Sequence, residues 1–147
     1  MLPEAARQHR CSVLIVDDDA EVRELLRIAL TSDGYDVGEA GNGRDALHYL
    51  RSHAETCIIV LDLLLPVMDG AHFRAAQLRD RSLGWIPVVV ISAAHDAPSR
   101  ARELGARRFV RKPLNIDEVR TALRHIGCCQ ARPRSCRASE SSMKRVS

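Results

Sequence analysis

Four short apolar segments of this chain each end in a residue that can take part in phosphoryl chemistry. Runs of four or five β-branched and apolar residues between helical patterns are typical of buried strands in a parallel sheet. In an open α/β sheet, the ligand site lies outside the carboxyl ends of the strands. Three carboxylates, a hydroxyl and an ammonium would therefore converge on one crevice, which predicts a site for a metal ion and a phosphate. In chain order, these side chains belong to Asp17, Asp18, Asp62, Ser92 and Lys112.

The three carboxylates predict a divalent cation at this site. Holding Asp17, Asp18 and Asp62 together costs roughly 1–4 kcal/mol of Coulomb repulsion per pair at about 4 Å. A hard divalent cation removes that cost, and Mg²⁺ prefers carboxylates, water and phosphate oxygens as ligands. The three carboxylates then balance Mg²⁺ and Lys112 in formal charge. A phosphoryl group on Asp62 would add one net negative charge, which we expect to attract the hydroxyl of Ser92.

Each of these residues also has an ordinary structural interpretation. A carboxylate that follows a strand is most often a helix cap, and Asp19 is predicted to cap the first helix. A lone Ser92 would usually be a turn residue, and a lone Lys112 would usually be a solvated charge. Their joint occurrence at four strand ends, in the expected order, favours a functional site.

Strands and helices alternate along the predicted domain. Strands are expected at residues 13–16, 35–40, 57–62, 86–92 and 107–111. Helices are expected to begin after Asp19, after Asn42-Gly43, after the turn that ends at Gly70, near Pro98 and after Asn115, and to end near Gly34, His53, Arg81, Gly105 and Ile126. This order predicts an α/β fold, a (βα)5 domain over residues 11–127 with an N-terminal extension at 1–10 and a tail at 128–147.

The composition suits one globular domain, since 46% of the 147 residues are hydrophobic and 28% are charged. Residues 1–10 contain no apolar signal segment, and no apolar run approaches the roughly 20 residues needed to cross a bilayer. We therefore expect a cytoplasmic protein. Cys11 and Cys57, at the starts of two strands, are predicted to be small buried residues. The tail cysteines match no paired zinc-ligand spacing, so reduced thiols are expected.

The net charge of +3 is unevenly distributed along the chain. From Gly127 onward, five cations face Glu140 alone, which gives this part +4 and leaves −1 on the rest. Ser, Arg and Pro dominate residues 128–147, which we expect to be disordered. The basic tail offers an alternative function, binding of nucleic acid through sequence-independent phosphate contacts. The tail lacks aromatic residues for base stacking, so this alternative is less favoured.

Short motifs surround the predicted site residues. They are the acidic pair in residues 16–18, the segment 62–70, the Ser92-Ala93 pair, the aromatic Phe109 and the Lys112-Pro113 pair. Together these motifs resemble those of the receiver domain of two-component response regulators, over residues 11–127. Each motif is modest by itself, whereas the combination is highly specific.

The resemblance implies a flavodoxin-like fold, a doubly wound five-stranded parallel sheet of order 2-1-3-4-5. It implies that Asp62 accepts a phosphoryl group from a phosphohistidine on a sensor histidine kinase or a histidine phosphotransfer protein. Asp17, Asp18, Asp62 and the backbone carbonyl of Leu64 would hold Mg²⁺ or Mn²⁺. The expected function is therefore that of a stand-alone receiver that switches protein partners.

The resemblance also implies how the signal leaves the site. Lys112 would pair with the phosphoryl group, and its peptide bond to Pro113 would be cis. Ser92, with Ala93 as its small neighbour, would move toward the phosphate, and Phe109 would turn inward. These movements would remodel the face formed by residues 98–105, 107–111 and 115–126, where a downstream effector binds and a homodimer could form.

A third function class is an enzyme that works through an aspartyl phosphate. Such haloacid-dehalogenase-like phosphatases need a second acid two residues after the nucleophile. That position is Leu64 here, so we expect a phosphoacceptor switch rather than an enzyme. Leu64 and Ala94, two residues after Asp62 and Ser92, lie where receiver side chains influence water access to the acyl phosphate. An apolar Leu64 cannot orient water, which predicts slow self-dephosphorylation.

Overall fold

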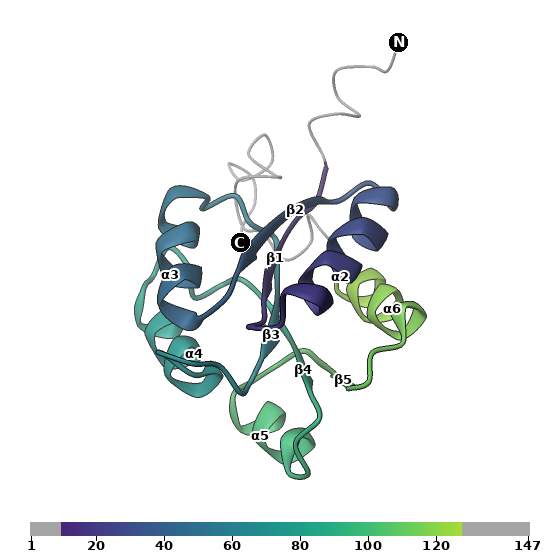
Figure 1. The fold of residues 1–147 in the computed structure, drawn as a ribbon. Helices are drawn as coiled ribbons and strands as arrows, with labels where there is room; N and C mark the ends of the chain where they lie inside the picture. Colours follow the sequence, from purple (N-terminus) through teal and green to yellow (C-terminus); the bar gives the residue numbers. More distant parts are fainter. Residues whose placement is uncertain (1–9, 128–147) are drawn as a thin grey trace.

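The computed structural model describes residues 10–127 and shows a parallel five-stranded sheet between two layers of helices (Figure 1). The elements are β1 (Ser12–Val16), α2 (Ala20–Ser32), β2 (Asp36–Ala40), α3 (Gly43–Ser52), β3 (Ile58–Asp62), α4 (Gly70–Arg79), β4 (Val88–Ser92), α5 (Ala97–Glu103), β5 (Arg108–Arg111) and α6 (Ile116–Ile126). The sheet order is β2-β1-β3-β4-β5, so the predicted (βα)5 fold and strand order are confirmed. Among the described helices, none is long and apolar enough to cross a membrane.

The observed elements are shorter than predicted at several ends. β4 begins at Val88 rather than at Ile86, because Pro87 has no N–H to donate to the neighbouring strand. α4 ends at Arg79 rather than near Arg81, since Asp80 has extended backbone angles and its side chain accepts a hydrogen bond from the Ser82 amide. The expected helix caps Asp19 and Asn115 both accept hydrogen bonds from backbone amides of the first helical turn.

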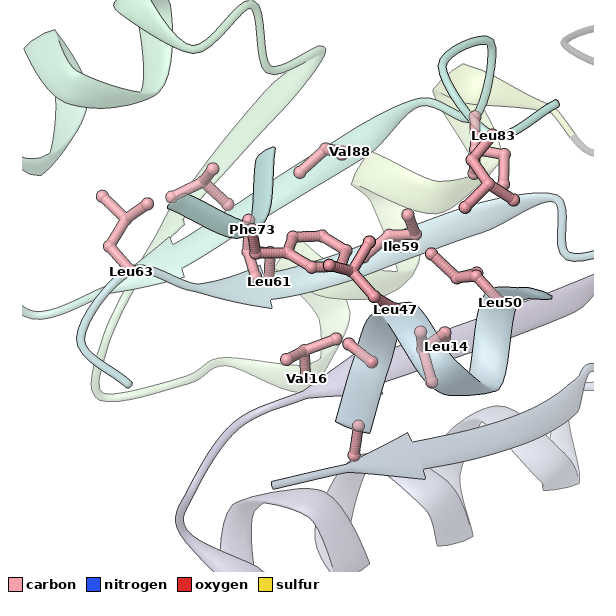
Figure 2. Close-up of a cluster of buried hydrophobic side chains, with 14 of the residues drawn as sticks. Leu14, Val16, Leu47, Leu50, Ile59, Leu61, Leu63, Phe73, Leu83 and Val88 are labelled. Carbon is pink, nitrogen blue, oxygen red and sulfur yellow. The ribbon is translucent and has the colours of Figure 1, made fainter. Parts of the chain in front are cut away.

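The sheet is buried on both faces, which explains the nearly continuous apolar strand sequences. On one face, strand side chains pack against α3, α4 and α5, and Figure 2 shows Phe73 of α4 in this cluster, with Leu61 and Ile59 of β3. On the other face, α2 and α6 cover a second cluster that includes Cys11 and Cys57. Both cysteines are buried, as predicted.

The strand register places the predicted site residues at one edge of the sheet. Val16 of β1 pairs with Leu61 of β3, so Asp17 follows β1 beside Asp62, the last residue of β3. Ile91 of β4 pairs with Asp62, and Ser92 pairs with Arg111 of β5. The residues after these pairs therefore meet at the carboxyl end of the sheet, although they are far apart in the sequence.

Residues 1–9 and 128–147 lie outside the described residues. The predictions made for the N-terminal extension and for the basic tail, including its cysteines and its nucleic-acid alternative, therefore remain predictions. Arg10 is the one residue of the expected extension that is described, and its guanidinium lies 3.0 Å from a carboxylate oxygen of Asp36.

Candidate functional site

Three carboxylates gather at the carboxyl end of the sheet. One oxygen from each of Asp17, Asp18 and Asp62 lies within 4.8 Å of the other two. Asp17 is fully buried and Asp62 is 5% exposed, whereas Asp18 is exposed. The chain turns between β1 and α2 because the Asp19 amide donates to Oδ1 of Asp17, at 2.8 Å, and the Asp19 side chain caps α2. This turn lets the carboxylates of two adjacent residues join the same cluster.

Arg23 holds this turn in place, a role that the sequence analysis missed. Its Nη1 donates to the carbonyl of Asp17 at 2.6 Å, and its Nε donates to Oε1 of Glu39 at 3.0 Å. Arg23 lies about one helical turn after Asp19, and Glu39 lies near the end of β2. The sequence did show an arginine one turn into the helix that follows the acidic pair. Its contact with Glu39 could not be predicted, because it depends on the register between β1 and β2.

A single ammonium joins two of the carboxylates. Lys112 Nζ lies 2.7 Å from Oδ2 of Asp17 and 3.1 Å from Oδ2 of Asp62. The Leu64 amide donates to the other oxygen of Asp62, at 3.2 Å. The Asp62 carboxylate is therefore held on both sides, with one oxygen toward Lys112 and one toward the loop after β3.

Burial, hydrogen bonds and charges at the site together explain two pKa shifts. Burial raises the pKa of Asp62, and the charge of Asp17 adds to this rise, while hydrogen bonding to Lys112 and to the Leu64 amide opposes it. Burial alone would lower the pKa of Lys112, but its hydrogen bonds and charge interactions with the two carboxylates raise it. The raised pKa favours the charged form of Lys112 but disfavours the charged form of Asp62. This difference arises because Lys112 interacts with two carboxylates, whereas Asp62 shares its one cation with Asp17.

This donor set fits a hard divalent cation. The three carboxylates carry three negative charges, and Lys112 is the one cation that pairs with them among the described residues. Two negative charges are left, which Mg²⁺ would balance, and carboxylate oxygens are ligands that Mg²⁺ prefers. Asp17, Asp18 and Asp62 are therefore the side chains that would hold the ion.

The predicted switch residues lie around the same edge. Ser92 is fully buried, and its Oγ accepts a hydrogen bond from the Ala94 amide at 3.1 Å, while Ala93 is exposed. Phe109 on β5 is partly buried, and the guanidinium of Arg111 lies 5.4 Å from its ring centroid. Arg111 Nη1 also donates to the Ala94 carbonyl at 3.1 Å. This contact between β5 and the loop after β4 was not predicted.

The loop after β3 approaches Asp62 closely. A Cβ on Gly70 would lie 2.9 Å from the Asp62 carbonyl oxygen and 2.8 Å from the Leu63 Cα, so only glycine fits there without displacement. Val67 has a φ of 67°, which is unusual for a β-branched residue. Leu64 and Val67 are both exposed, at 57% and 69%.

The peptide bond between Lys112 and Pro113 is cis, as the resemblance implied.

Comparison with known proteins agrees with this arrangement. The family model described as "response regulator receiver domain" matches residues 13–124. The chain therefore belongs to the response regulator receiver domain family.

Similar proteins include transcriptional regulators and a chemotaxis protein. The chain is 36% identical, over 116 residues, to the transcriptional regulatory protein KdpE of Staphylococcus aureus, covering 78% of this chain and 48% of the relative. It is 33% identical, over 117 residues, to the probable transcriptional regulator ycf27 of Porphyridium aerugineum, covering 78% and 47%. The chain thus spans about half the length of these curated relatives. The structure of CheY4, the chemotaxis response regulator of Vibrio cholerae, superposes with a TM-score of 0.73 at 26% identity, covering 80% of this chain and 98% of CheY4.

Proposed function

We propose that this chain is a phosphoacceptor switch in which Asp62 receives a phosphoryl group from a phosphohistidine on a sensor histidine kinase or a phosphotransfer protein. The observation that carries the proposal is the placement of Asp62, with Oδ2 3.1 Å from Lys112 and one carboxylate oxygen within 4.8 Å of those of Asp17 and Asp18. Two-component partners of this kind are general for receiver domains.

The proposed transfer forms one bond and breaks one. A carboxylate oxygen of Asp62 attacks phosphorus, and the P–N bond of the phosphohistidine breaks. Its electron pair returns to the imidazole, which leaves neutral when its other nitrogen carries a proton. A bound Mg²⁺, held by the three carboxylates and the Leu64 carbonyl, would balance charge on the phosphoryl oxygens. Lys112 supplies a fixed positive charge to the same oxygens, and the Leu64 amide orients Asp62.

Signal output would begin at Ser92, whose hydroxyl lies at the end of the adjacent strand. Moving this hydroxyl toward a phosphorylated Asp62 breaks its bond with the Ala94 amide and shifts the loop that leads to α5. Phe109, which lines a groove between β5 and α6 with Arg111, would turn inward. The face formed by α5, β5 and α6 would then present a changed surface to an effector or to a second copy of the chain.

The proposed role differs from that of an enzyme with a separate substrate. Leu64 lies two residues after Asp62 and provides no acid for a leaving group. The chain would act in the cytoplasm, where a kinase domain could reach it. Two of the named relatives, KdpE and ycf27, are described as transcriptional regulators, but the nucleic-acid alternative for this chain rests on residues 128–147, outside the described part of the chain.

Labelling with a small phosphodonor tests the proposal. The protein is incubated with acetyl phosphate and Mg²⁺, and its intact mass is measured. We expect the added mass of one phosphoryl group, lost on chelation of the metal and in Asp62→Asn. Asp96→Asn is the matched control, because Asp96 is an exposed carboxylate that makes no side-chain cap hydrogen bond. Equal labelling of Asp62→Asn and the wild type would overturn the proposal.

A further inference from the structure

Arg74 on α4 is a buried cation for which the proposed function provides no role. It is only 7% exposed, and among residues 10–127 no carboxylate forms an ion pair with it. Burial lowers the pKa of its guanidinium, although an arginine remains protonated in proteins. A buried charge without a counter-charge is costly unless hydrogen bonds compensate it, so its contacts need an explanation.

The guanidinium of Arg74 donates to the end of another helix. Its Nε lies 2.9 Å from the carbonyl of Leu104, the C-cap of α5, and its Nη2 lies 3.3 Å from the carbonyl of Gly105. Gly105 has a φ of 72°, which ends the helix. A cation at these carbonyls also interacts favourably with the negative end of the helix dipole.

Gln77, fully buried one turn later on α4, fixes the guanidinium in place. Its Oε1 accepts a hydrogen bond from Arg74 Nη1 at 2.7 Å. Its Nε2 donates to the carbonyls of Leu83 and Ile86, at 2.9 and 3.0 Å. Every nitrogen of the Arg74 guanidinium and both polar atoms of the Gln77 amide thus take part in hydrogen bonds, and together the two side chains connect α4, the loop before β4 and the C-terminal end of α5.

The opposite end of α5 has no side-chain cap. The other four described helices have a side-chain cap, whereas Asp96 makes no cap hydrogen bond at the start of α5. The two buried residues of α5 are Ala97 and Ala101, which offer little apolar surface. The Ala97 amide donates to Ala94, whose own amide donates to Ser92. The end of α5 that lacks a side-chain cap is therefore the one connected to the proposed switch hydroxyl.

We propose that Arg74 and Gln77 form a fixed anchor for the C-terminal end of α5, so that a shift of the loop after Ser92 turns the helix about that end. Arg74 is a positioning residue in this arrangement and does not touch the phosphoryl site. The direction of the movement rests on the proposed function, whereas the anchor itself can be tested without phosphorylation.

Amide hydrogen exchange, measured by NMR on the full chain, tests the anchor first. The Leu104 and Ala106 amides, which donate to Arg100 and Ala101, report on the C-terminal end of α5. In unmodified Arg74→Met, we expect these two amides to exchange at least about tenfold faster than in the wild type, because the anchored end opens more often. Arg79→Met is the matched control, since Arg79 is exposed on the same helix. Equal exchange in the two variants would overturn the anchor.

Phosphorylation by acetyl phosphate tests the turning movement. In the wild type, we expect exchange at the Ala97 and Arg100 amides to change by about fivefold or more, and exchange at Leu104 and Ala106 by less than about twofold. In Arg74→Lys, which keeps the charge but loses the forked contacts, both ends should respond. This variant also serves if Arg74→Met does not fold.

The end of α5 at which amide exchange changes on phosphorylation decides whether the helix turns about its C-terminal end. A wild-type response of equal size at both ends of α5, or an unchanged pattern in Arg74→Lys, would overturn the turning movement. Intact mass confirms phosphorylation in each sample. If no phosphoryl group is added, the proposed function fails, and with it the turning movement, while the comparison of unmodified Arg74→Met and Arg79→Met still decides the anchor.

Discussion

The Lys112 ammonium lies closer to Asp17 than to Asp62, at 2.7 Å and 3.1 Å from the respective Oδ2 atoms. Asp17 is fully buried and Asp62 nearly so, and one ammonium cannot neutralise both carboxylates. The remaining negative charge therefore falls mainly on Asp62, which agrees with the raised pKa that burial and Asp17 give it. This unbalanced charge costs stability, and it fits the proposed binding of a further cation and a phosphoryl group.

Asp62→Asn is expected to stabilise the protein when a chelator removes divalent ions. Removing one of two buried, close carboxylates should raise the free energy of unfolding by about 1 kcal/mol. At a Mg²⁺ concentration of about ten times its Kd, the ion should raise the free energy of unfolding of the wild type by about 1.4 kcal/mol. The same Mg²⁺ concentration should stabilise Asp62→Asn much less, because one of the three carboxylates is missing. Urea unfolding with and without Mg²⁺ measures both effects. Asp96→Asn should leave both unchanged, and a stabilised Asp96→Asn or a destabilised Asp62→Asn would contradict the charge argument.

Gly70→Ala is expected to disturb the phosphoacceptor strand directly. The new Cβ would lie 2.9 Å from the Asp62 carbonyl oxygen and 2.8 Å from the Leu63 Cα, and neither is a flexible side-chain end. We expect a loss of about 2 kcal/mol in unfolding free energy and slower labelling by acetyl phosphate. Gly41→Ala is the control, because its Cβ would meet only the end of the Arg23 side chain, at 3.5 Å. Equal stability of the two variants would show that the contact is tolerated.

Leu64→Asn is expected to speed the loss of the phosphoryl group from Asp62. Leu64 is 57% exposed beside the acceptor, and a polar amide there can orient water where the apolar side chain cannot. We expect the phosphoryl group to be lost on the order of tenfold faster than in the wild type, since a positioned water lowers the barrier to hydrolysis. The decay is followed by intact mass after removal of the phosphodonor. Val67→Asn, an exposed apolar-to-amide change in the same loop, should decay like the wild type, and equal rates in all three proteins would refute the prediction.

Asp69 is expected to contribute a pH-dependent part of the stability. The His72 amide donates to its Oδ1 at 2.9 Å and caps α4, and this bond is the main cause of the lowered pKa of Asp69. A carboxyl whose pKa is lowered by folding stabilises the protein above the unfolded pKa of about 4. That contribution is lost as the pH falls through the lower folded value. Asn can also cap the helix but carries no charge. The difference in unfolding free energy between the protein with Asp69 and the Asp69→Asn variant should therefore shrink below about pH 4.

Denaturant unfolding between neutral and acidic pH measures this advantage. The comparison is made in a His72→Ala background, which keeps the capping amide and removes the imidazole that contacts Asp69. Asp69→Ala should lose about 1 kcal/mol at neutral pH, because the cap itself is lost. An advantage over Asp69→Asn that stays constant down to low pH would exclude a charge contribution from this cap.

Local sequence patterns were sufficient to predict the order of the elements and to place the candidate site residues at one end of the sheet. Apolar runs predicted the strands, and polar residues such as Asp19 and Asn115 predicted helix starts, because caps act on amides two or three residues away. The site residues could be recognised because each lies within two residues of the carboxyl end of a strand, and parallel strands bring those ends together at one end of the sheet. The sequence also indicated Gly70 as part of a family motif, but not why a glycine is needed there.

Only the tertiary structure decided which distant groups meet. The contacts of Arg23 with Glu39, of Arg111 with Ala94 and of Arg74 with Leu104 join different elements, so their existence depends on sheet register and helix packing. Within the sequence, Arg74 is one of many arginines on a charged chain, and nothing local distinguishes it from the exposed Arg79. Its burial and its partners follow from how α4 packs beside the end of α5, because long-range packing, rather than spacing along the chain, determines which polar side chains leave water.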